Sequence, residues 1–540
     1  MINLKDLNKK ARDSFKRREN FDDQFDDINR FIRPNSPEFN SKTVNGDIRM
    51  EEVFDGSAIQ DLQQFVSGLY SHTVAGDWFR LLPPRWMKDS PAAKEYLEEV
   101  KKTLFDYYDD PETSFTLAIP EAYWEIGAYG TACVFQDYED GQLILRTYPL
   151  SKVGIEENNK GRVDEVFIED EWTIKQIVQE FGEDALPAGE SDKKDTDKLK
   201  VVNAVIPSNL RVLGGHNAKG KKYTSVYWLD KYAEDEKVKP LRVSGYDQFP
   251  YHVPRWTKIA GETFGRGQGL MAIHDVRCLQ KIMSNLLEAS EKAVNPIIVA
   301  NESAIIGDVS MEPGDVIYVN NLGQTGKPIE QAFVHGDIPA GYEMLERVRE
   351  QVRDYFFVNL LIRPKKKERQ TTVEIADDRD EMLKQLAPMT SRMEKELFHP
   401  MIKRSIFLLD KKELLPEPPN GMTVDDIKIF FTSPSARAQR GFKVAAIRQY
   451  AQIATEMGTL DPRAVKAVDG VMALKVVADE LEVPSEAKRT LREIEAMEQE
   501  EAEQLQAERQ AEINMNNSAA AKNFSDAQAT QQSMAGGLGF

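Results

Sequence analysis

The fold is decided by the stretch FGRGQGLMAIHDVRCLQKIMSNLLEASEKAVNP, residues 264–296. It opens with glycines at every second position, and it continues into a run whose apolar residues recur every three or four positions. This spacing predicts an amphipathic helix over residues 270–294, which would be about 37 Å long. Asn295-Pro296 ends the helix, because proline cannot continue it.

A second helix with the same apolar spacing is predicted over residues 341–358. Residues 295–340 separate the two helices, and they contain many Gly and Pro turns with two short β-rich runs, Ile297–Ala300 and Val316–Val319. Two helices that flank an inserted module lie naturally antiparallel. The sequence therefore predicts a pair of antiparallel helices joined by a small β-rich module.

The glycine cluster Gly265-Arg266-Gly267-Gln268-Gly269 has two interpretations. A glycine-rich turn before a helix can bind a phosphate group through backbone N–H groups. However, the spacing differs from that of a dinucleotide-binding fingerprint, and no βαβ unit precedes the cluster. We therefore favour a tight turn from a strand into the helix.

The rest of the chain mixes helical and β-rich stretches. Helices are predicted over residues 4–32, 57–72, 91–109, 116–127, 372–409, 435–457 and 462–481. Strands are predicted over residues 77–84, 132–135, 143–148, 163–168, 201–213, 223–230, 253–258 and 427–431. These patterns predict an α+β fold that is mainly helical.

The overall composition excludes several classes of protein. The net charge of −19 argues against a domain that holds nucleic acid over a wide surface, since such domains are basic. The two cysteines, Cys133 and Cys278, exclude a disulfide framework and a cysteine-rich zinc site, and they suit a reducing cytoplasm. No apolar run approaches the length of about 18 residues that a membrane helix needs, and residues 1–10 lack the apolar core of a signal peptide. We expect a protein that is neither secreted nor membrane-spanning.

Motifs of catalytic chemistry are missing from the sequence. It contains no Walker A loop, no GxSxG elbow, no HExxH motif and no histidine pair at metal-binding spacing. Two acidic groups could in principle hold metal ions: the residues Asp22, Asp23, Asp26 and Asp27, and the run at 377–381. A solvated helix face is the favoured interpretation of the first group, and a solvated, ion-paired helix face is the favoured interpretation of the second. We expect no catalytic residue, no metal and no cofactor, and therefore no enzyme.

The densest basic cluster of the chain lies in residues 359–371. Its five cations, within seven residues, are Arg363, Lys365, Lys366, Lys367 and Arg369. One interpretation is a solvated connection between helices, or a patch that pairs with acidic neighbours across a subunit interface. The other is a loop that contacts DNA phosphates, and it is favoured because Pro364 breaks the helix at this point.

Several segments, in this order over roughly residues 5–440, resemble the portal (head-to-tail connector) proteins of podovirus-type double-stranded DNA bacteriophages. They are Phe54-Asp55-Gly56-Ser57-Ala58-Ile59, Asp77-Trp78-Phe79-Arg80-Leu81, Arg146-Thr147-Tyr148-Pro149-Leu150, Phe264-Gly265-Arg266-Gly267 and Thr371-Thr372-Val373-Glu374-Ile375. The last departs slightly from the family, which often has Thr-Ala-Thr-Glu followed by an aliphatic residue. The C-terminal part resembles the family only in general character.

The resemblance implies a ring, usually of twelve subunits, with wing, stem, clip and crown regions around a channel. The expected regions are a wing at 1–264 and 372–434, stem helices at 265–294 and 341–358, a clip at 295–340, a tunnel loop at 359–371 and a crown at 435–513. Residues 514–540 have the composition of a disordered tail.

The implied function is a channel at one capsid vertex for DNA packaging, DNA ejection and tail attachment. The implied partners are further copies of the chain, double-stranded DNA, the terminase motor, the tail adaptor, and the capsid and scaffolding proteins, without any membrane. The place of action would be the virion, with assembly in the host cytoplasm. An acidic ring with one basic loop per subunit would let DNA slide rather than hold it. The alternatives are another virion structural protein, such as a tail adaptor or scaffold, and a DNA-processing enzyme.

Overall fold

The computed structural model describes residues 4–480, with gaps, and scattered residues between 497 and 527. The gaps before 480 are 35, 38, 41–49, 75, 88–89, 188–189, 191–193, 209–219, 235–238, 295–297, 301–304, 307–317, 320–328, 332–337, 362–385, 387, 420, 433, 459–460, 462 and 464–466. The chain divides into two compact units, Met1–Gln439 and Arg440–Phe540.

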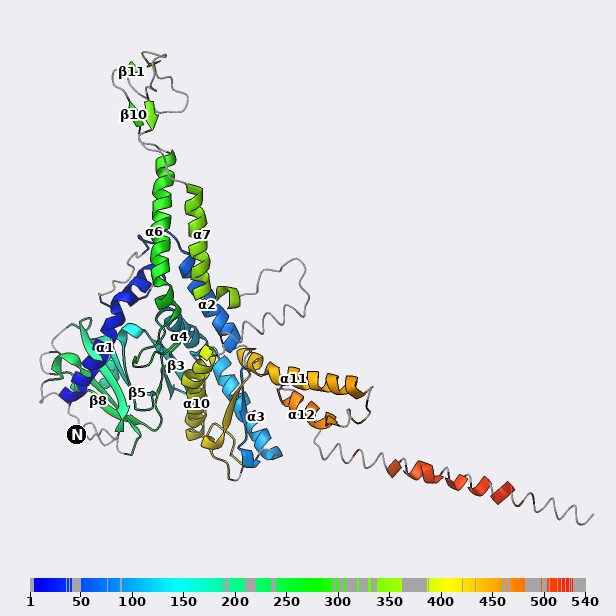
Figure 1. The fold of residues 1–540 in the computed structure, drawn as a ribbon. Coiled ribbons are helices and arrows are strands. Elements are labelled where there is room, and N and C mark those ends of the chain that lie inside the picture. The colour runs from blue at the N-terminus through cyan, green and yellow to red at the C-terminus, as the bar shows by residue number, and fades with distance from the viewer. Residues whose placement is uncertain are drawn as a thin grey trace, which may run out of the picture. The chain divides into compact units, whose positions relative to one another are not determined.

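A five-stranded antiparallel sheet forms one side of the first unit. Its strands, in spatial order, are β4 (Val153–Glu157), β5 (Val163–Thr173), β6 (Lys198–Pro207), β7 (Tyr223–Leu229) and β8 (Arg242–Tyr246). Helix α1 (Leu4–Phe31) lies across one face (Figure 1), where Leu4, Leu7 and Ala11 pack against alternate residues of β6 and β7. Arg18 of α1 also donates hydrogen bonds from Nη1 to the carbonyl oxygens of Leu150 (2.8 Å) and Val153 (3.0 Å), so the helix covers the β4 edge of the sheet.

The opposite face of this sheet has two covers. Helix α5 (Ile174–Phe181) buries Ile174 and Ile177 against one part of it. A smaller antiparallel sheet, in the order β3 (Gln142–Tyr148), β2 (Cys133–Glu139) and β9 (Tyr251–His252), joins the other part to the largest core of the molecule. The large sheet is therefore the middle layer between α1 on one side and α5 with the small sheet on the other.

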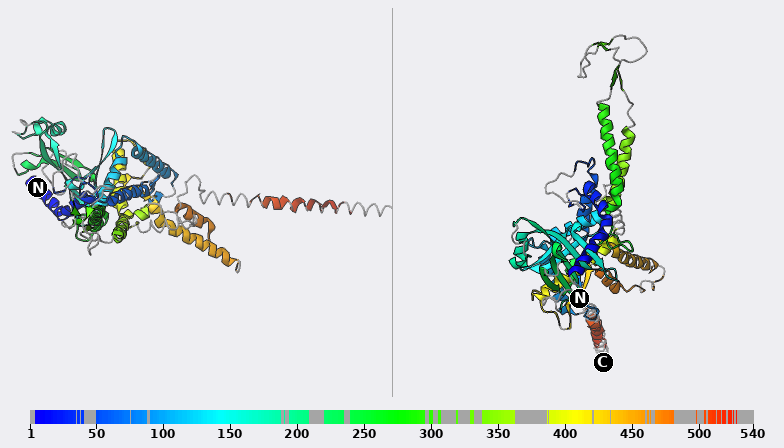
Figure 2. Two further views of the ribbon diagram at one scale, coloured as in Figure 1. Left: turned by 90° about the horizontal axis from the view of Figure 1, so that it is seen from above. Right: turned by 90° about the vertical axis from the view of Figure 1, so that its left-hand side faces the viewer.

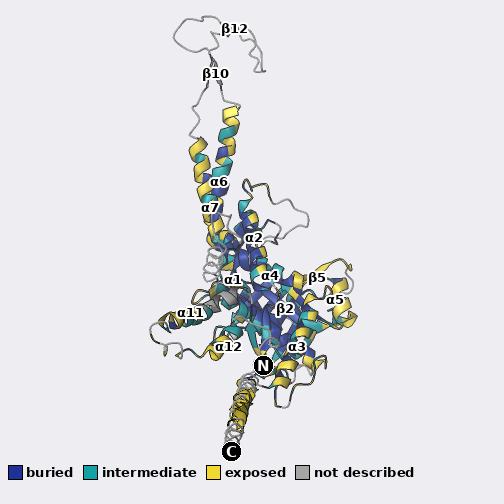
Figure 3. Ribbon diagram, turned by 90° about the vertical axis from the view of Figure 1, so that its right-hand side faces the viewer, coloured by how far each residue is buried: buried dark blue, intermediate teal, exposed yellow. Residues whose placement is uncertain are grey.

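The largest core is mainly helical, and Figure 3 shows that buried residues concentrate there. It packs α2 (Ser57–Thr73), α3 (Pro91–Asp109), α4 (Phe115–Tyr129) and α10 (His399–Lys411), which follows a π-helical turn at Glu394–Phe398. Distant parts of the sequence meet in it, because β1 (Phe79–Leu82) pairs with β14 (Lys428–Phe431). Trp78, beside β1, stacks on Phe431 and also contacts Phe398.

Two antiparallel helices project from this core (Figures 1 and 2). They are α6 (Gln268–Val294) and α7 (Ile338–Tyr355), and the short helix α8 (Val358–Leu361) follows them. The described residues between α6 and α7 form two antiparallel strand pairs, β10 (Ile298–Ala300) with β13 (Ile329–Gln331) and β11 (Ile305–Ile306) with β12 (Tyr318–Val319). The predictions of an antiparallel helix pair and of β structure between its helices are confirmed.

The second unit contains most of α11 (Pro434–Gly458) and all of α12 (Gly470–Glu480). Both helices expose large apolar side chains, namely Tyr450, Ile453, Met457, Val471, Met472, Leu474 and Val476. The predicted helix at 462–481 begins later than expected, because Asp469 accepts a hydrogen bond from the Met472 N–H (3.0 Å) and so starts α12 there.

The mixed α+β architecture is as predicted, and the structure corrects several strand predictions. The predicted strand at 253–258 is absent, because β9 covers only Tyr251–His252 and Pro254 has no N–H to continue a ladder. The predicted strand at 201–213 ends as β6 at Pro207, and residues 209–219 lie outside the described part of the chain. The sequence patterns missed β4, β8 and α5 altogether. Of the predicted helix at 372–409, the described residues begin at Leu386.

The glycine cluster forms the tight turn that the sequence favours. Gly130 ends α4 with a positive φ of 93°, and the turn at 265–269 crosses this helix end. A Cβ atom at Gly267 would lie 2.5 Å from the Ile126 carbonyl oxygen and 2.5 Å from the Gly130 nitrogen. The backbone of the cluster is thus packed against α4.

Gly267→Ala tests this close packing. Since the added methyl group would force two backbone segments apart, we expect the free energy of unfolding to fall by about 1–3 kcal/mol. Gly56→Ala is the matched control, because no atom lies within 4 Å of the Cβ position there. Chemical unfolding of both variants measures the effect, and equal stabilities would contradict the close approach.

Candidate functional site: the base of the helical hairpin

The two projecting helices form a hairpin that is held by one apolar cluster. Leu279 and Leu286 of α6 are buried against Leu345 of α7, with Ile282, Met283 and Val348 partly buried around them. Gly341 lets the helices approach closely, because a Cβ atom there would lie 2.6 Å from Leu286 Cδ2. Towards its β-rich end, however, the hairpin exposes large apolar side chains (Figure 3), namely Leu287, Val294, Tyr342 and Met344.

The base of the hairpin is fixed by Asp55, just before α2. One carboxylate oxygen of Asp55 accepts two hydrogen bonds from Arg349 of α7, from Nε (2.8 Å) and Nη2 (2.6 Å). Its other oxygen accepts a hydrogen bond from the Ser57 N–H at 2.8 Å. The side chain is only 2% exposed, so an acidic group and its arginine partner are largely removed from water at this point.

The other helix of the hairpin is bound to the same residues. The Oε1 atom of Gln280 in α6 accepts hydrogen bonds from the Phe54 and Asp55 N–H groups, both at 2.8 Å. Its Nε2 atom donates to the Asp55 carbonyl oxygen at 2.7 Å. One turn before α2 therefore connects α2, α6 and α7, and the segment Phe54–Ile59 noted in the sequence forms this junction.

Asp55 and Asp61, both facing α7, differ in their electrostatics. Burial alone would raise the pKa of Asp55, but hydrogen bonds from Ser57 and Arg349 outweigh burial and the pKa is lowered. Burial raises the pKa of Asp61 to about 6. The positive charge of Arg353 lowers this pKa only weakly, because its Nε atom lies 3.9 Å from Asp61 Oδ1, and the negative charge of Asp55 raises it further. The Oδ2 atom of Asp61 is buried without a hydrogen-bond partner among the described residues.

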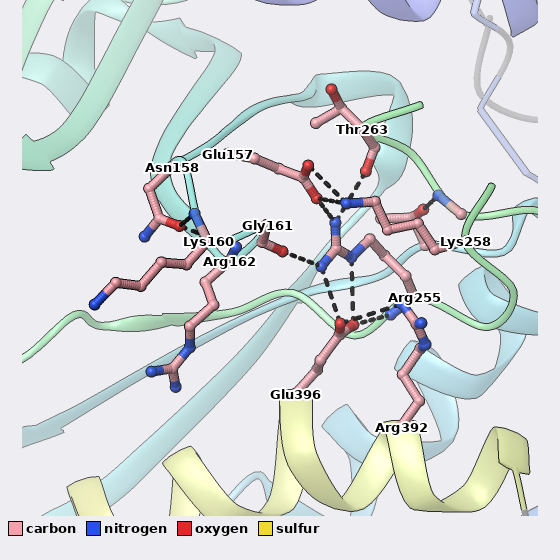
Figure 4. A network of polar contacts seen from close by, with 12 residues as sticks. Glu157, Asn158, Lys160, Gly161, Arg162, Arg255, Lys258, Thr263, Arg392 and Glu396 are labelled. Carbon is pink, nitrogen blue, oxygen red and sulfur yellow. Dashed lines mark hydrogen bonds and ion pairs between the residues drawn. The ribbon is translucent and has the colours of Figure 1, made fainter. Parts of the chain in front are cut away.

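A second polar network, centred on Arg255, holds the chain that leads into the hairpin (Figure 4). The Arg255 side chain is only 2% exposed. Its guanidinium group pairs with Glu396, which lies in the π-helical turn, at a distance of 2.9 Å between Nη2 and Oε1. It also pairs with Glu157, the last residue of β4. It also donates to the Gly161 carbonyl oxygen at 3.1 Å and to the Thr263 carbonyl oxygen at 3.3 Å. The network therefore joins the large sheet, the glycine turn and the helix region that leads to α10.

The acidic residues on α1 have structural partners. Asp22 pairs with Arg18, Asp26 accepts hydrogen bonds from the Phe39 and Asn40 N–H groups, and Asp27 pairs with Arg277 of α6. Over the described residues, no group of three or more His, Cys, Asp or Glu side chains could hold a metal ion. The favoured interpretation of a solvated helix face is wrong for Asp22, which is buried beside Arg18, whereas Asp23 is exposed.

The predicted DNA-contacting residues Arg363, Lys365, Lys366, Lys367 and Arg369 lie outside the described residues, as does the acidic run at 377–381. The structure describes the residues that flank the segment 362–385. Leu361 is 7% exposed and packs against α2 at Gly68, and Leu386 is 1% exposed in the same core. The residues that flank the segment 362–385 therefore both lie in this core.

Sequence reasoning missed the junction and the Arg255 network. The stretch Phe54–Ile59 was recognised as characteristic, but its partners Gln280 and Arg349 lie more than 200 positions away and follow no local pattern. Arg255 and Glu396 are 141 positions apart, and no local pattern connects them either. Contacts of such long range become visible only in the fold.

The chain is similar to known proteins over most of its length. A family model described as "Bacteriophage head to tail connecting protein" matches residues 4–487. The chain therefore belongs to the bacteriophage head-to-tail connecting proteins, which are structural components of the virion at the capsid vertex.

Two relatives make the similarity more specific. The chain is 26% identical to the portal protein of Salmonella phage epsilon15 over 537 residues, which is 96% of this chain and 94% of that protein. It is 26% identical to the probable portal protein of Bordetella phage BPP-1 over 511 residues, with 92% and 90% covered. The prediction of a phage portal function is confirmed. None of the helices that the structure describes is long and apolar enough to cross a membrane.

Asp55→Asn and Asp61→Asn form a matched pair with opposite expected effects. Asp55→Asn weakens the pairing with Arg349 and should lower the free energy of unfolding by about 3 kcal/mol. Asp61→Asn removes a buried charge and should raise it near neutral pH by about 2–3 kcal/mol, since each pKa unit corresponds to about 1.4 kcal/mol.

The pH dependence of the free energy of unfolding differs in sign for the two residues. Asp61 has an ordinary pKa of 3.8 when unfolded and a pKa of about 6 when folded, so its charge lowers stability as the pH rises through this window. The advantage of Asp61→Asn should therefore vanish below about pH 4. The lowered pKa of Asp55 has the opposite effect, because its contribution is lost as the pH falls. Urea unfolding across this range measures both, and an Asp61→Asn variant without a gain near neutral pH would contradict the raised pKa.

Proposed function

We propose that the chain is the subunit of a portal ring, of twelve copies, whose central channel passes double-stranded DNA during packaging and ejection. The hairpin of α6 and α7, which carries a small β module and is fixed at its base to Asp55, is the observation that supports this most directly. In this proposal the α6–α7 hairpin is the stem (265–294 and 341–358), and 295–340 is the clip. The wing comprises 1–264 and 372–434, the crown 435–513 and the tail 514–540.

The exposed apolar residues of the hairpin support self-association. Val294 is 87% exposed, and Leu287, Tyr342 and Met344 are each about half exposed. A helix pair of this kind buries such side chains against the neighbouring copy, and a heterologous interface that closes under rotation gives a ring.

The basic segment supports the channel. Residues 359–371 would form the tunnel loop, with Arg363, Lys365, Lys366, Lys367 and Arg369 directed towards passing phosphates. Leu361 and Leu386 flank the segment 362–385 and lie in the core, so the proposed loop would begin and end there. Contacts of lysine and arginine with phosphates are non-specific and salt-sensitive, which suits sliding.

Each proposed region would bind its own partners. The clip would dock the terminase motor during packaging and the tail adaptor afterwards, whereas the wing would meet the capsid and scaffolding proteins. Assembly would take place in the host cytoplasm, without a membrane, and the chain itself would perform no catalysis.

Ring formation is the first test. Purified protein should form rings with a central hole in negative-stain images and give a mass of about twelve subunits by native mass spectrometry. Leu287→Glu combined with Tyr342→Glu should shift it towards the monomer, whereas Trp86→Glu, at a residue 61% exposed on the body of the first unit, should not. A wild-type protein that stays monomeric at micromolar concentration would contradict the proposal.

The basic segment gives the second test. Replacing Lys365, Lys366 and Lys367 together by alanine should leave rings intact and should reduce the DNA packaged per capsid, because phosphate contacts are lost. The control is the triple alanine variant of Lys94, Lys102 and Lys175, which are exposed elsewhere. Packaging of a full genome at the normal rate by the first variant would show that these lysines do not contact DNA.

A further inference from the structure

Helix α1 divides into a basic half and an acidic half. Residues 4–18 contain seven Lys and Arg residues against two Asp residues, a net charge of +5, although the whole chain carries −19. Residues 19–31 contain five Asp and Glu residues against one Arg, a net charge of −4. The first half of α1 is therefore a local concentration of positive charge in an acidic protein.

Those cations of the basic half that lie beside the large sheet have partners within the chain. Lys10 Nζ donates to Glu165 Oε1 at 2.7 Å, and Arg17 Nη1 donates to Glu156 Oε2 at 2.5 Å. Arg18 is buried against the start of β4. These three residues hold the helix on the sheet, and their charge is compensated or enclosed.

The remaining cations form a row along the outer face of the helix, namely Lys5, Lys9, Arg12 and Lys16. Their spacing of four, three and four positions places them on one face, and all four are exposed. The outer row is about 16 Å long, because an α-helix rises about 1.5 Å per residue.

Most of the charge in the outer row is uncompensated. Arg12 reaches Asp230 at 3.3 Å and Glu234 at 3.5 Å, and it stays half exposed. No carboxylate in the described part of the chain pairs with the three lysines. The outer row therefore presents three ammonium groups to a partner outside the subunit.

The outer face of α1 offers charge without apolar surface. None of the large apolar side chains that are exposed in the described part of the chain belongs to this helix. A protein partner would need an apolar centre to its interface, whereas a phosphate backbone is bound by cations alone. A single small anion would fill only a fraction of a row about 16 Å long. These features favour a polymer of phosphates, such as double-stranded DNA, which carries one negative charge per about 1.7 Å of its axis.

The outer row is separate from the basic segment at 359–371. Leu361, the last described residue before the segment 362–385, packs on α2, whereas the first half of α1 packs on the large sheet (Figure 1). Charges in solution act over about 8 Å at physiological salt. The row therefore acts on its own surroundings, and most of the acidic excess of the chain is screened from it.

We propose that the first half of α1 is a second DNA-binding surface, which contacts the phosphate backbone of double-stranded DNA outside the channel. Lys5, Lys9 and Lys16 each donate to phosphate oxygens, and the contacts carry no sequence preference because no base edge is reached. The presence of DNA at the protein rests on the proposed function, but the surface itself does not, since it is separate from the proposed tunnel loop.

The test uses a covalently closed circle of double-stranded DNA, added to full-length protein that has already assembled. A closed circle cannot be threaded through a closed ring, so its binding reports on outer surfaces alone. Filter binding at several salt concentrations should give a Kd of about 1–100 μM at physiological salt, as for other non-specific contacts. The affinity should fall steeply as the salt concentration rises.

Replacing Lys5, Lys9 and Lys16 together by alanine should weaken binding of the circle at least tenfold. The slope of log Kd against log salt concentration should fall by about 0.9 for each lost contact, or about 2.7 for each subunit that contacts the circle. Unchanged affinity and an unchanged salt slope would overturn the proposal. If the triple variant fails to fold, Lys9→Gln in the middle of the row should still lower the slope by about 0.9 per subunit.

Two further variants locate the contact. The triple alanine variant of Lys94, Lys102 and Lys175 is the matched control, and it should bind the circle as the wild type does. The triple alanine variant of Lys365, Lys366 and Lys367 should also bind the circle normally, because the proposed tunnel loop lies inside the ring. Loss of circle binding in either variant, equal to the loss in the α1 variant, would contradict a contact that is specific to α1.

A poly-glutamate peptide separates DNA from an acidic protein as the partner. If the α1 variant loses the peptide and keeps the DNA circle, the surface binds protein and the proposal is wrong. Ring formation is measured on the same samples. A protein that forms no rings would contradict the proposed function, whereas the comparison of the α1 variant with its matched control would still decide whether α1 binds DNA.

Discussion

The carboxylate of Asp55 is the point on which the arrangement of the first unit depends. It binds Arg349 of α7 directly, and the backbone of the same turn is held by Gln280 of α6, so a single turn before α2 fixes both helices of the hairpin. An unpaired carboxylate at this depth would be strongly destabilising, and the partners therefore have to be in place whenever the unit is folded. The orientation of a long projecting element is thus set by a few polar contacts at its base.

An apolar cluster and a polar junction stabilise different features of the hairpin. The apolar cluster around Leu286 and Gly341 holds α6 and α7 together. This cluster does not determine the direction in which the helix pair projects from the core. The polar junction at the base sets the direction, and the Arg255 network fixes the glycine turn from which α6 starts. Asp61 adds a weak and partly unsatisfied contact to the same interface, so not every contact between α2 and α7 has been optimised for stability.

The sequence predicted those parts of the fold that have a local cause. The spacing of apolar residues gave the helices at 4–32, 57–72, 91–109 and 270–294 to within a few residues, and the glycines at 265–269 indicated the tight turn. Strand β4 and helix α5 were missed because both are short, at five and eight residues. The partners of Asp55 and Arg255 could not be predicted, since only the packed fold brings residues 55, 280 and 349 together.

The contact of Arg18 with the edge of the large sheet has a consequence for aggregation. An uncovered edge strand offers unpaired N–H and C=O groups to any other chain. By donating to the carbonyl oxygens of Leu150, just before β4, and of Val153, its first residue, Arg18 occupies the start of this edge within its own chain. Pairing of another strand with the start of β4 is thereby hindered.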